Sequence, residues 1–173
     1  MNFFKLLIFI FITSCSSTMQ IDKFKNAKPE FLLEDYFSGK VKAWGLFHDR
    51  FGNLKRTFEV DIDGTLNSDL LILDEKFLYD DGEKDQRIWK IKLLGEKSYS
   101  GTADDVVGEA LGKASGNALN WTYKLNLKVK DSVIMVDFDD WMFLQDNQIL
   151  MNRAEVKKWG VTLGVVTITF LKL

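Results

Sequence analysis

The chain has 173 residues and a formal net charge of −2, from 23 basic and 25 acidic residues. This near balance leaves no basic surface for nucleic acid, so we expect no nucleic-acid partner. One cysteine and one histidine exclude a disulfide framework and a cysteine–histidine metal site. We therefore predict neither a bound metal nor a cofactor.

Residues 1–14 are predicted to be a lipoprotein signal peptide. Lys5 precedes an apolar run over residues 6–12, and two small residues then complete a cleavage site. The run is too short for a transmembrane helix, which needs about 20 apolar residues. Ile12-Thr13-Ser14-Cys15 has the pattern of a lipobox, in which the Cys15 thiol takes a diacylglyceryl group. An ordinary signal peptide, or an uncleaved anchor with an incidental cysteine, is the alternative.

Residues 15–28 are predicted to be a lipidated tether between the membrane and a folded domain. Several acyl chains on Cys15 would anchor the chain firmly, since each buried CH₂ contributes about 0.8 kcal/mol. The residues that follow are mostly small or polar and include three lysines, as expected of a mobile linker. Ser16 is not the Asp that favours inner-membrane retention, so we predict an outer-membrane lipoprotein that faces the periplasm.

Residues 29–173 are predicted to form a single domain that begins with a short helix. Pro29, two early acidic residues and Gly39 bracket a helical turn over residues 31–37, although an extended entry strand would also fit. Beyond it, apolar and polar residues alternate with the period of two that is typical of strands. The predicted strands cover residues 41–48, 58–62, 70–79, 89–93, 98–103, 121–129, 133–143, 148–157 and 161–173.

Short turns between these nine or so strands imply an antiparallel meander. An open sheet this long tends to curl, and closing it removes its unpaired edges. We therefore predict an all-β fold, an antiparallel up-and-down, lipocalin-like β-barrel of about 8–10 strands. A β-sandwich is the alternative.

Residues 103–117 break the alternation, because small residues recur and glycines stand at positions 108, 112 and 116. We expect a long hairpin connection or a short helix that packs over one end of the barrel. The alternative is a lid or ligand portal, since long ordered loops are often functional.

The motifs together resemble a family of bacterial lipoproteins known only as domain of unknown function 3833. The resemblance runs from about Phe31 to the C-terminus and supports a lipid-anchored envelope protein without implying an activity. A looser likeness to lipocalins supports a similar barrel. The family motifs are Ala43-Trp44-Gly45, Asp49-Arg50, Leu73-Asp74-Glu75, Asp81-Gly82-Glu83, Gly116-Asn117-Ala118-Leu119, Asp139-Asp140-Trp141-Met142 and Asn152-Arg153-Ala154.

We predict no catalytic residues, although three polar clusters were considered. His48-Asp49-Arg50 lacks a nucleophile and indicates a strand end with a structural Asp–Arg contact. The acidic residues 80–83, close to Asp74-Glu75, indicate a hairpin turn. Asp137, Asp139 and Asp140, with Asn152-Arg153 on the next strand, indicate a solvated or hydrogen-bonded structural corner, with a polar cluster at one mouth of the barrel as the alternative.

A candidate ligand site comes from side chains expected to share the inner face. If Glu75 and Arg87 both point inward, they meet inside the barrel, either as an ion pair that fixes the strand register or as a polar anchor for a ligand head group. The predicted ligand-binding residues are Glu75, Arg87, Trp89, Trp121 and Tyr123.

These features predict a non-enzymatic envelope lipoprotein that binds or shuttles a small apolar ligand, such as a fatty acid or lipid. Its partners would be the membrane, through lipidated Cys15, and that ligand. The alternative is a structural or assembly partner of another envelope protein, with a solid barrel core.

Overall fold

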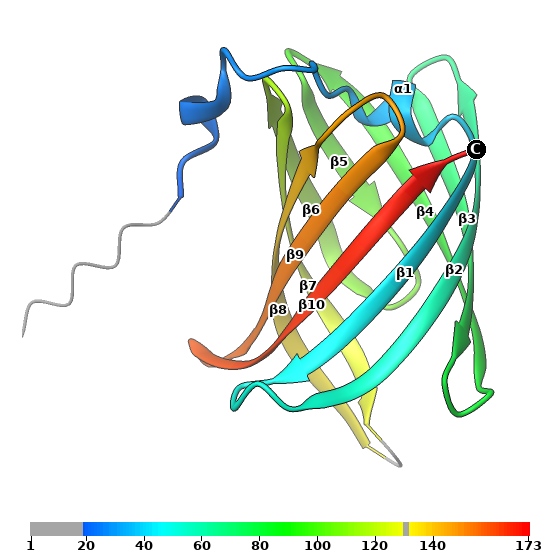
Figure 1. Cartoon of the computed structure of the whole chain (residues 1–173), viewed down its shortest axis with the longest axis vertical. Coiled ribbons are helices and arrows are strands. Elements are labelled where there is room, and N and C mark those ends of the chain that lie inside the picture. Colours follow the sequence, from blue (N-terminus) through cyan, green and yellow to red (C-terminus); the bar gives the residue numbers. More distant parts are fainter. Residues whose placement is uncertain (1–18, 130–131) are drawn as a thin grey trace, which may run out of the picture.

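A computed structural model describes residues 19–129 and 132–173; the predicted signal peptide and the predicted lipid anchor Cys15 lie outside this part of the chain. Ten antiparallel strands form a closed up-and-down barrel (Figure 1), in which each strand pairs with its sequence neighbours and the first pairs with the last. The predicted all-β barrel is confirmed, and the β-sandwich alternative is wrong. The barrel has two strands more than the eight of a lipocalin.

Two helical turns precede the strands. The elements are η1 (Ile21–Phe24), α1 (Leu33–Phe37), β1 (Gly39–Asp49), β2 (Leu54–Asn67), β3 (Leu70–Tyr79), β4 (Lys84–Gly95), β5 (Ser98–Thr102), β6 (Val106–Ser115), β7 (Ala118–Val129), β8 (Ser132–Leu144), β9 (Ile149–Lys158) and β10 (Val161–Lys172).

The period-two pattern of each strand separates an inner face from an outer one. In β1, Val41 and Ala43 are buried, whereas Trp44 and Leu46 are exposed on the outside. Successive side chains of a strand point to opposite faces, so a one-residue slip would reverse every one of them. The register between β1 and β10, from Val41↔Lys172 to Asp49↔Gly164, closes the sheet and pairs both of its edges.

The prediction for residues 103–117 is wrong, because most of this segment is strand β6 and only residues 103–105 connect it to β5. Ala110 and Ala114 are buried, and Gly112 lies directly opposite Trp121 of β7. A Cβ atom on Gly112 would lie 2.1 Å from the Trp121 ring. The small residues that resembled a loop are therefore strand residues, of which Gly112 makes room for an indole, and the ten observed strands lie within the predicted range of 8–10.

The predicted helical turn is confirmed as α1, which covers one end of the barrel (Figure 1). Leu33, Tyr36 and Phe37 are all buried there, and the Phe37 and Phe170 rings pack edge to face with centroids 5.5 Å apart. The extended entry strand is therefore wrong. Within residues 19–129 and 132–173, no helix is long and apolar enough to span a membrane.

The predicted tether is ordered in its described part. Residues 21–24 form the η1 turn, and Phe24 packs on the outside of β8, with its ring centroid 6.0 Å from that of Trp141 and 5.3 Å from that of Phe143. Gly116 then approaches the backbone of this segment so closely that a Cβ atom would lie 1.8 Å from the Phe24 carbonyl oxygen. This part of the segment is a strap on the barrel wall and not a free linker.

Candidate functional site

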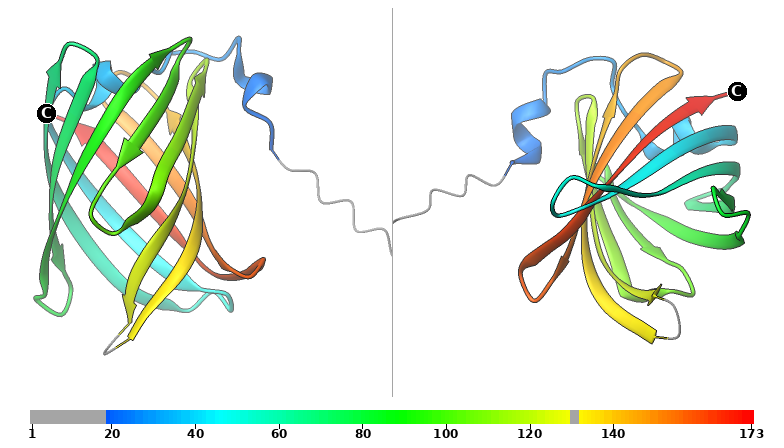
Figure 2. Two further views of the ribbon diagram at one scale, coloured as in Figure 1. Left: turned by 180° about the vertical axis from the view of Figure 1, so that it is seen from behind. Right: turned by 60° about the horizontal axis from the view of Figure 1, so that its bottom comes forward.

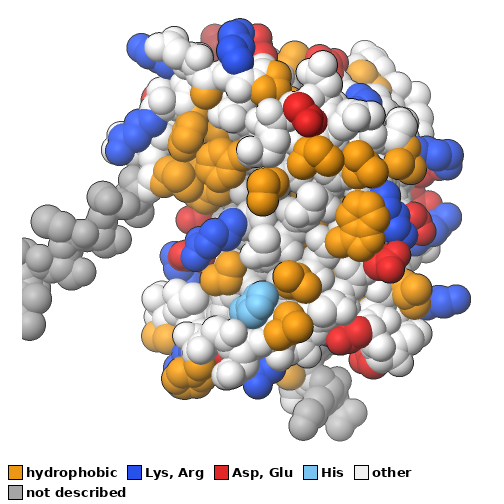
Figure 3. Space-filling view, in the orientation of Figure 1, with side chains coloured by type: hydrophobic (Ala, Val, Ile, Leu, Met, Phe, Trp, Pro, Cys, Tyr) orange, Lys and Arg blue, Asp and Glu red, His pale blue; other side chains and the backbone are white. Residues whose placement is uncertain are grey.

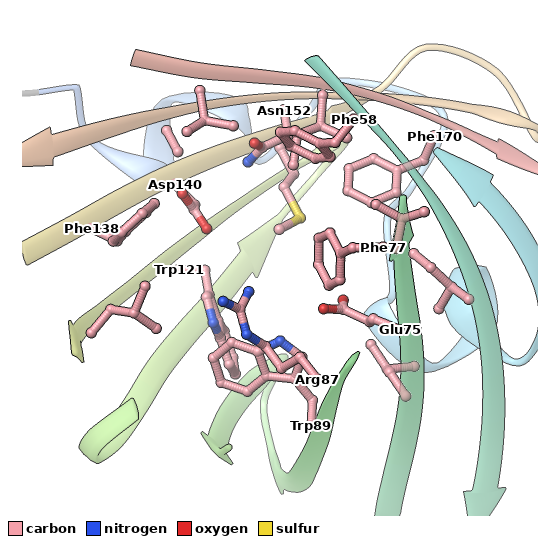
Figure 4. Close-up of a pocket in the computed structure, with 18 of the residues that line it drawn as sticks. Phe58, Glu75, Phe77, Arg87, Trp89, Trp121, Phe138, Asp140, Asn152 and Phe170 are labelled. Carbon is pink, nitrogen blue, oxygen red and sulfur yellow. The ribbon is translucent and has the colours of Figure 1, made fainter. Parts of the chain in front are cut away.

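A cavity of about 270 Å³ lies inside the barrel, between α1 and the end that carries the β1–β2, β3–β4 and β9–β10 turns. Its walls are mainly aliphatic and aromatic side chains, with a few polar groups at mid-depth. All five predicted ligand-binding residues line it, and Figure 4 labels four of them; the set is Glu75, Arg87, Trp89, Trp121 and Tyr123.

Aromatic rings form one wall of the cavity. The Trp89 ring meets Trp121 and Tyr123 edge to face, with centroids 5.7 and 5.5 Å apart, and Tyr123 stacks on Phe138 at 5.0 Å. These arrangements suit the ring quadrupoles and favour one packing over others. The wall is therefore a rigid apolar surface against which a ligand would lie.

Arg87 and Glu75 are cross-strand partners that both reach the cavity, yet Arg87 forms its ion pair with Asp105. Its Nε and Nη2 atoms donate to Asp105 Oδ2 over 3.0 and 2.6 Å. Both side chains point inward as predicted, but among the described residues no ion pair joins Arg87 to Glu75, so the ion-pair interpretation is wrong. Asp105 was missed because its segment was expected to cover a barrel end.

Glu75 is a carboxyl group set in an apolar wall. Part of its surface remains reachable from the cavity, but burial from bulk water raises its pKa to about 7, and the charge of Arg87 offsets only part of this shift. Desolvation opposes the charged form of any buried acid. Glu75 therefore exchanges a proton near neutral pH instead of remaining a fixed anion.

Asp140 and Asn152 also line the cavity, and together with Glu75 and Arg87 they form what we call its polar belt. The sequence pattern did not place Asp140 and Asn152 inside the barrel. Asp140 Oδ2 accepts a hydrogen bond from the Tyr123 hydroxyl over 3.2 Å. Burial raises the pKa of Asp140 to about 7 and raises that of Tyr123 well above its usual value. Within the described residues, Asp140 Oδ1 and Asn152 Nδ2 are buried with no hydrogen-bond partner.

A family profile described as "Protein of unknown function (DUF3833)" matches residues 9–172. The chain belongs to this family. The resemblance drawn from the sequence motifs is thereby confirmed. No curated protein matches the chain.

The three acids of β8 in this DUF3833 protein divide between the two faces of the strand. The alternative of a cluster at one mouth is therefore wrong, and the hydrogen-bonded corner describes Asp137 and Asp139 but not Asp140. Asp137 and Asp139 point outward, where they meet Lys124 and Asn120 of β7. Asp140 has the opposite orientation and lies at mid-depth. On β9, Arg153 likewise points outward, to Glu155.

The two other polar clusters of the DUF3833 protein organise turns. Asp49 Oδ1 accepts hydrogen bonds from the backbone N–H groups of Phe51 and Asn53, each over 2.9 Å, and the Asn53 side chain is the main reason that the pKa of Asp49 is lowered. The expected Asp49–Arg50 contact is wrong, because Arg50 lies over the Phe51 ring. Asp81 accepts from the Glu83 N–H, which confirms the predicted hairpin turn.

Proposed function

We propose that this DUF3833 protein is a non-enzymatic envelope lipoprotein whose barrel binds or shuttles a small apolar ligand, such as a fatty acid or lipid. Lipidated Cys15 would hold it at the outer membrane, with the barrel in the periplasm. The cavity is the observation that carries this proposal. Ligand sites are typically concave and mostly apolar, with a few placed polar groups, and this one has that composition.

The cavity favours ligand binding over a barrel with a solid core. Side chains can fill the interior of a small barrel completely, but here space remains between the aromatic wall and the Glu75 side of the barrel (Figure 4). Well-packed interiors contain few voids larger than a water molecule. A retained cavity with polar groups at mid-depth is better suited to a ligand than to packing alone.

Native mass spectrometry of residues 20–173 tests this proposal. We expect a co-purified apolar ligand, or binding of a fluorescent fatty acid to the stripped domain. Ala154 lies on the cavity wall and is buried, so Ala154→Leu should reduce binding by filling space. Thr122→Leu, an outward change on β7, should not. Repeated preparations without ligand and without probe binding would contradict the proposal.

Labelling cells with radioactive palmitate tests the anchor. The chain should take up label and fractionate with the outer membrane, and Cys15→Ser should abolish both. A Cys15→Ser variant that still takes up label would refute lipidation at this residue.

A second candidate function, assembly with another envelope protein, is favoured by an apolar outer face. Trp44, Thr169 and Met151 lie side by side across β1, β10 and β9, and Trp44 and Met151 are 44% and 45% exposed. Hydrophobic side chains spread over the middle of this face in Figure 3. A photo-crosslinking residue at Trp44 should then capture one envelope protein that the same residue at Asn126 does not.

A further inference from the structure

The polar belt of the cavity contains two buried groups with free hydrogen-bonding capacity. Asp140 is 7% exposed and Asn152 3%, and both point into the cavity from β8 and β9 (Figure 4). Their free atoms are of opposite kinds, a carboxyl oxygen and an amide N–H, and neither has a partner among residues 19–129 and 132–173. A buried polar group without a partner is costly, so such pairs usually face a ligand or an ordered water.

The strand register places these two side chains close together. Asp140 pairs with Ala154, and Asn152 pairs with Met142, so Asp140 and Asn152 are diagonal neighbours on the inner face. Such neighbours lie roughly 7–8 Å apart, and their Cβ atoms are somewhat closer. Two short side chains directed into the same space leave room between them for one small polar group.

We propose that Asp140 and Asn152 form the head-group subsite of the cavity, and that it takes an amphiphile whose uncharged head donates and accepts hydrogen bonds, as a hydroxyl does. This inference rests on the proposed ligand binding. A hydroxyl donates to the Asp140 oxygen and accepts from the Asn152 N–H. An ammonium head has no acceptor for Asn152, and a carboxylate head has no donor for Asp140.

Charge around the subsite also opposes an anionic head. The groups that act on Asp140 are Tyr123 on β7, Arg87 on β4, Glu75 on β3 and Asp139 on its own strand. Arg87 is paired with Asp105, and its positive charge offsets only part of the effect of burial on the two cavity acids. A carboxylate ligand would bring a further negative charge next to Glu75 and Asp140, and its binding should weaken as these two groups ionise.

The experiment compares three ten-carbon amphiphiles on the full chain purified from membranes in detergent. 1-Decanol, decanoic acid and decylamine are titrated at pH 6 and pH 8, and complexes are counted by native mass spectrometry. We expect decanol to bind at both pH values, and decanoic acid to lose affinity at pH 8. Equal or tighter binding of decanoate at pH 8, or of decylamine at either pH, would overturn the head-group assignment.

Asn152→Leu separates a binding role from a structural one. Replacing a partnerless buried amide by an apolar group should leave the free protein equally or more stable, while decanol binding falls roughly three- to ten-fold. Asn126→Leu on the outer face of β7 is the matched control. Asp140→Asn, which keeps the shape, should reduce the pH dependence of decanoic acid binding, and Glu75 accounts for the part that remains. Unchanged decanol affinity in Asn152→Leu would mean that an ordered water alone occupies the subsite, and would refute the assignment.

The outcomes also separate this inference from the proposed function. If none of the three amphiphiles binds the unaltered chain, ligand binding itself fails. If all three bind without preference, and the Asn152 and Asp140 variants change nothing, the cavity binds ligands but the head-group subsite is refuted.

Discussion

Trp121 shows how single residues shape the cavity. Its indole approaches two neighbouring strands so closely that a Cβ atom on Gly101 or Gly112 would lie 2.7 or 2.1 Å from the ring. Glycine at these positions is a packing requirement, since Trp121 lies between them and the cavity space. The aromatic wall therefore depends on residues that have no side chain.

Gly112→Ala should destabilise the barrel by about 1–3 kcal/mol, because the added methyl group forces the Trp121 ring from its packed position. Adding Trp121→Leu should recover part of the loss, since the two residues are in contact and their effects will not add. Urea unfolding of both single variants and the double variant measures this coupling. Lys113→Ala, an outward change next to Gly112, is the control. Additive losses would contradict direct contact.

Inward-facing residues could be predicted wherever the alternation is clean. Glu75, Arg87 and Trp121 could be placed in this way because apolar partners two residues away mark the inner face. Asp140 shares the inner face with Phe138 and Met142, so the signal was present. The neighbouring outward-facing acids obscured it, and the cluster therefore resembled a solvated corner.

Among the elements, the β5–β6 hairpin is the shortest part of the wall. Figure 2 shows that it turns back before the barrel end that the β3–β4 turn reaches. The β4–β5 ladder spans only Lys90 to Gly95. Beyond it, Asp105 holds the wall together, since its side chain pairs with Arg87 and its carbonyl accepts from the Asn126 N–H over 2.8 Å. These two contacts of Asp105 join β4 to β7 across the turn between the intervening strands β5 and β6.

Asp105→Asn should loosen these contacts at a cost of about 1–2 kcal/mol, because a charge-assisted bidentate contact becomes a neutral one at a partly exposed site. Hydrogen exchange should accelerate at the hairpin tip, residues 102–107, and at the Asn126 amide. Asp104→Asn, a change at the exposed neighbour, should leave both unchanged. Equal exchange in the two variants would show that the backbone contacts suffice.

The strap and α1 differ in how deeply they are packed, and this difference can be measured. Phe37→Ala should cost about 3–5 kcal/mol, because the ring is 3% exposed and fills the barrel end. Phe24 is only partly buried on the outer wall. Phe24→Ala should therefore release residues 19–28 to limited proteolysis with little change in the urea midpoint. A large loss of global stability in Phe24→Ala would mean that the strap belongs to the cooperative core.

At the scale of the whole molecule, the period-two pattern and the turn spacing were sufficient to predict a closed meander. They gave a range of 8–10 strands that includes the observed ten, but they missed β6, because it is built from small residues whose burial depends on Trp121 of β7. Nor could they reveal the cavity, which is the space that large inward side chains leave unfilled. Such a volume depends on how side chains from many strands meet, and no local pattern records it.

Titration of the cavity carboxyls couples the stability of the whole barrel to pH. The pKa values of Glu75 and Asp140 rise from ordinary values of 4.5 and 3.8 to about 7 on folding. Between about pH 4 and pH 7 the folded protein therefore binds more protons than the unfolded chain. In this window the free energy of unfolding must fall as pH rises, and above about pH 7 the contribution levels off.

We therefore expect the urea midpoint to fall between about pH 5 and pH 7.5, and the double variant Glu75→Gln/Asp140→Asn to flatten this slope. Asp81→Asn is the control. The pKa of Asp81 is lowered, mainly by the hydrogen bond from the Glu83 backbone N–H. The stabilisation that ionised Asp81 provides is therefore lost only as pH falls below about 4. The control should lose stability evenly across the window and keep the slope. A wild-type midpoint that stays level or rises from pH 5 to 7.5 would mean that the two carboxyls remain ionised inside the barrel, and the binding of decanoic acid should then not change between pH 6 and pH 8.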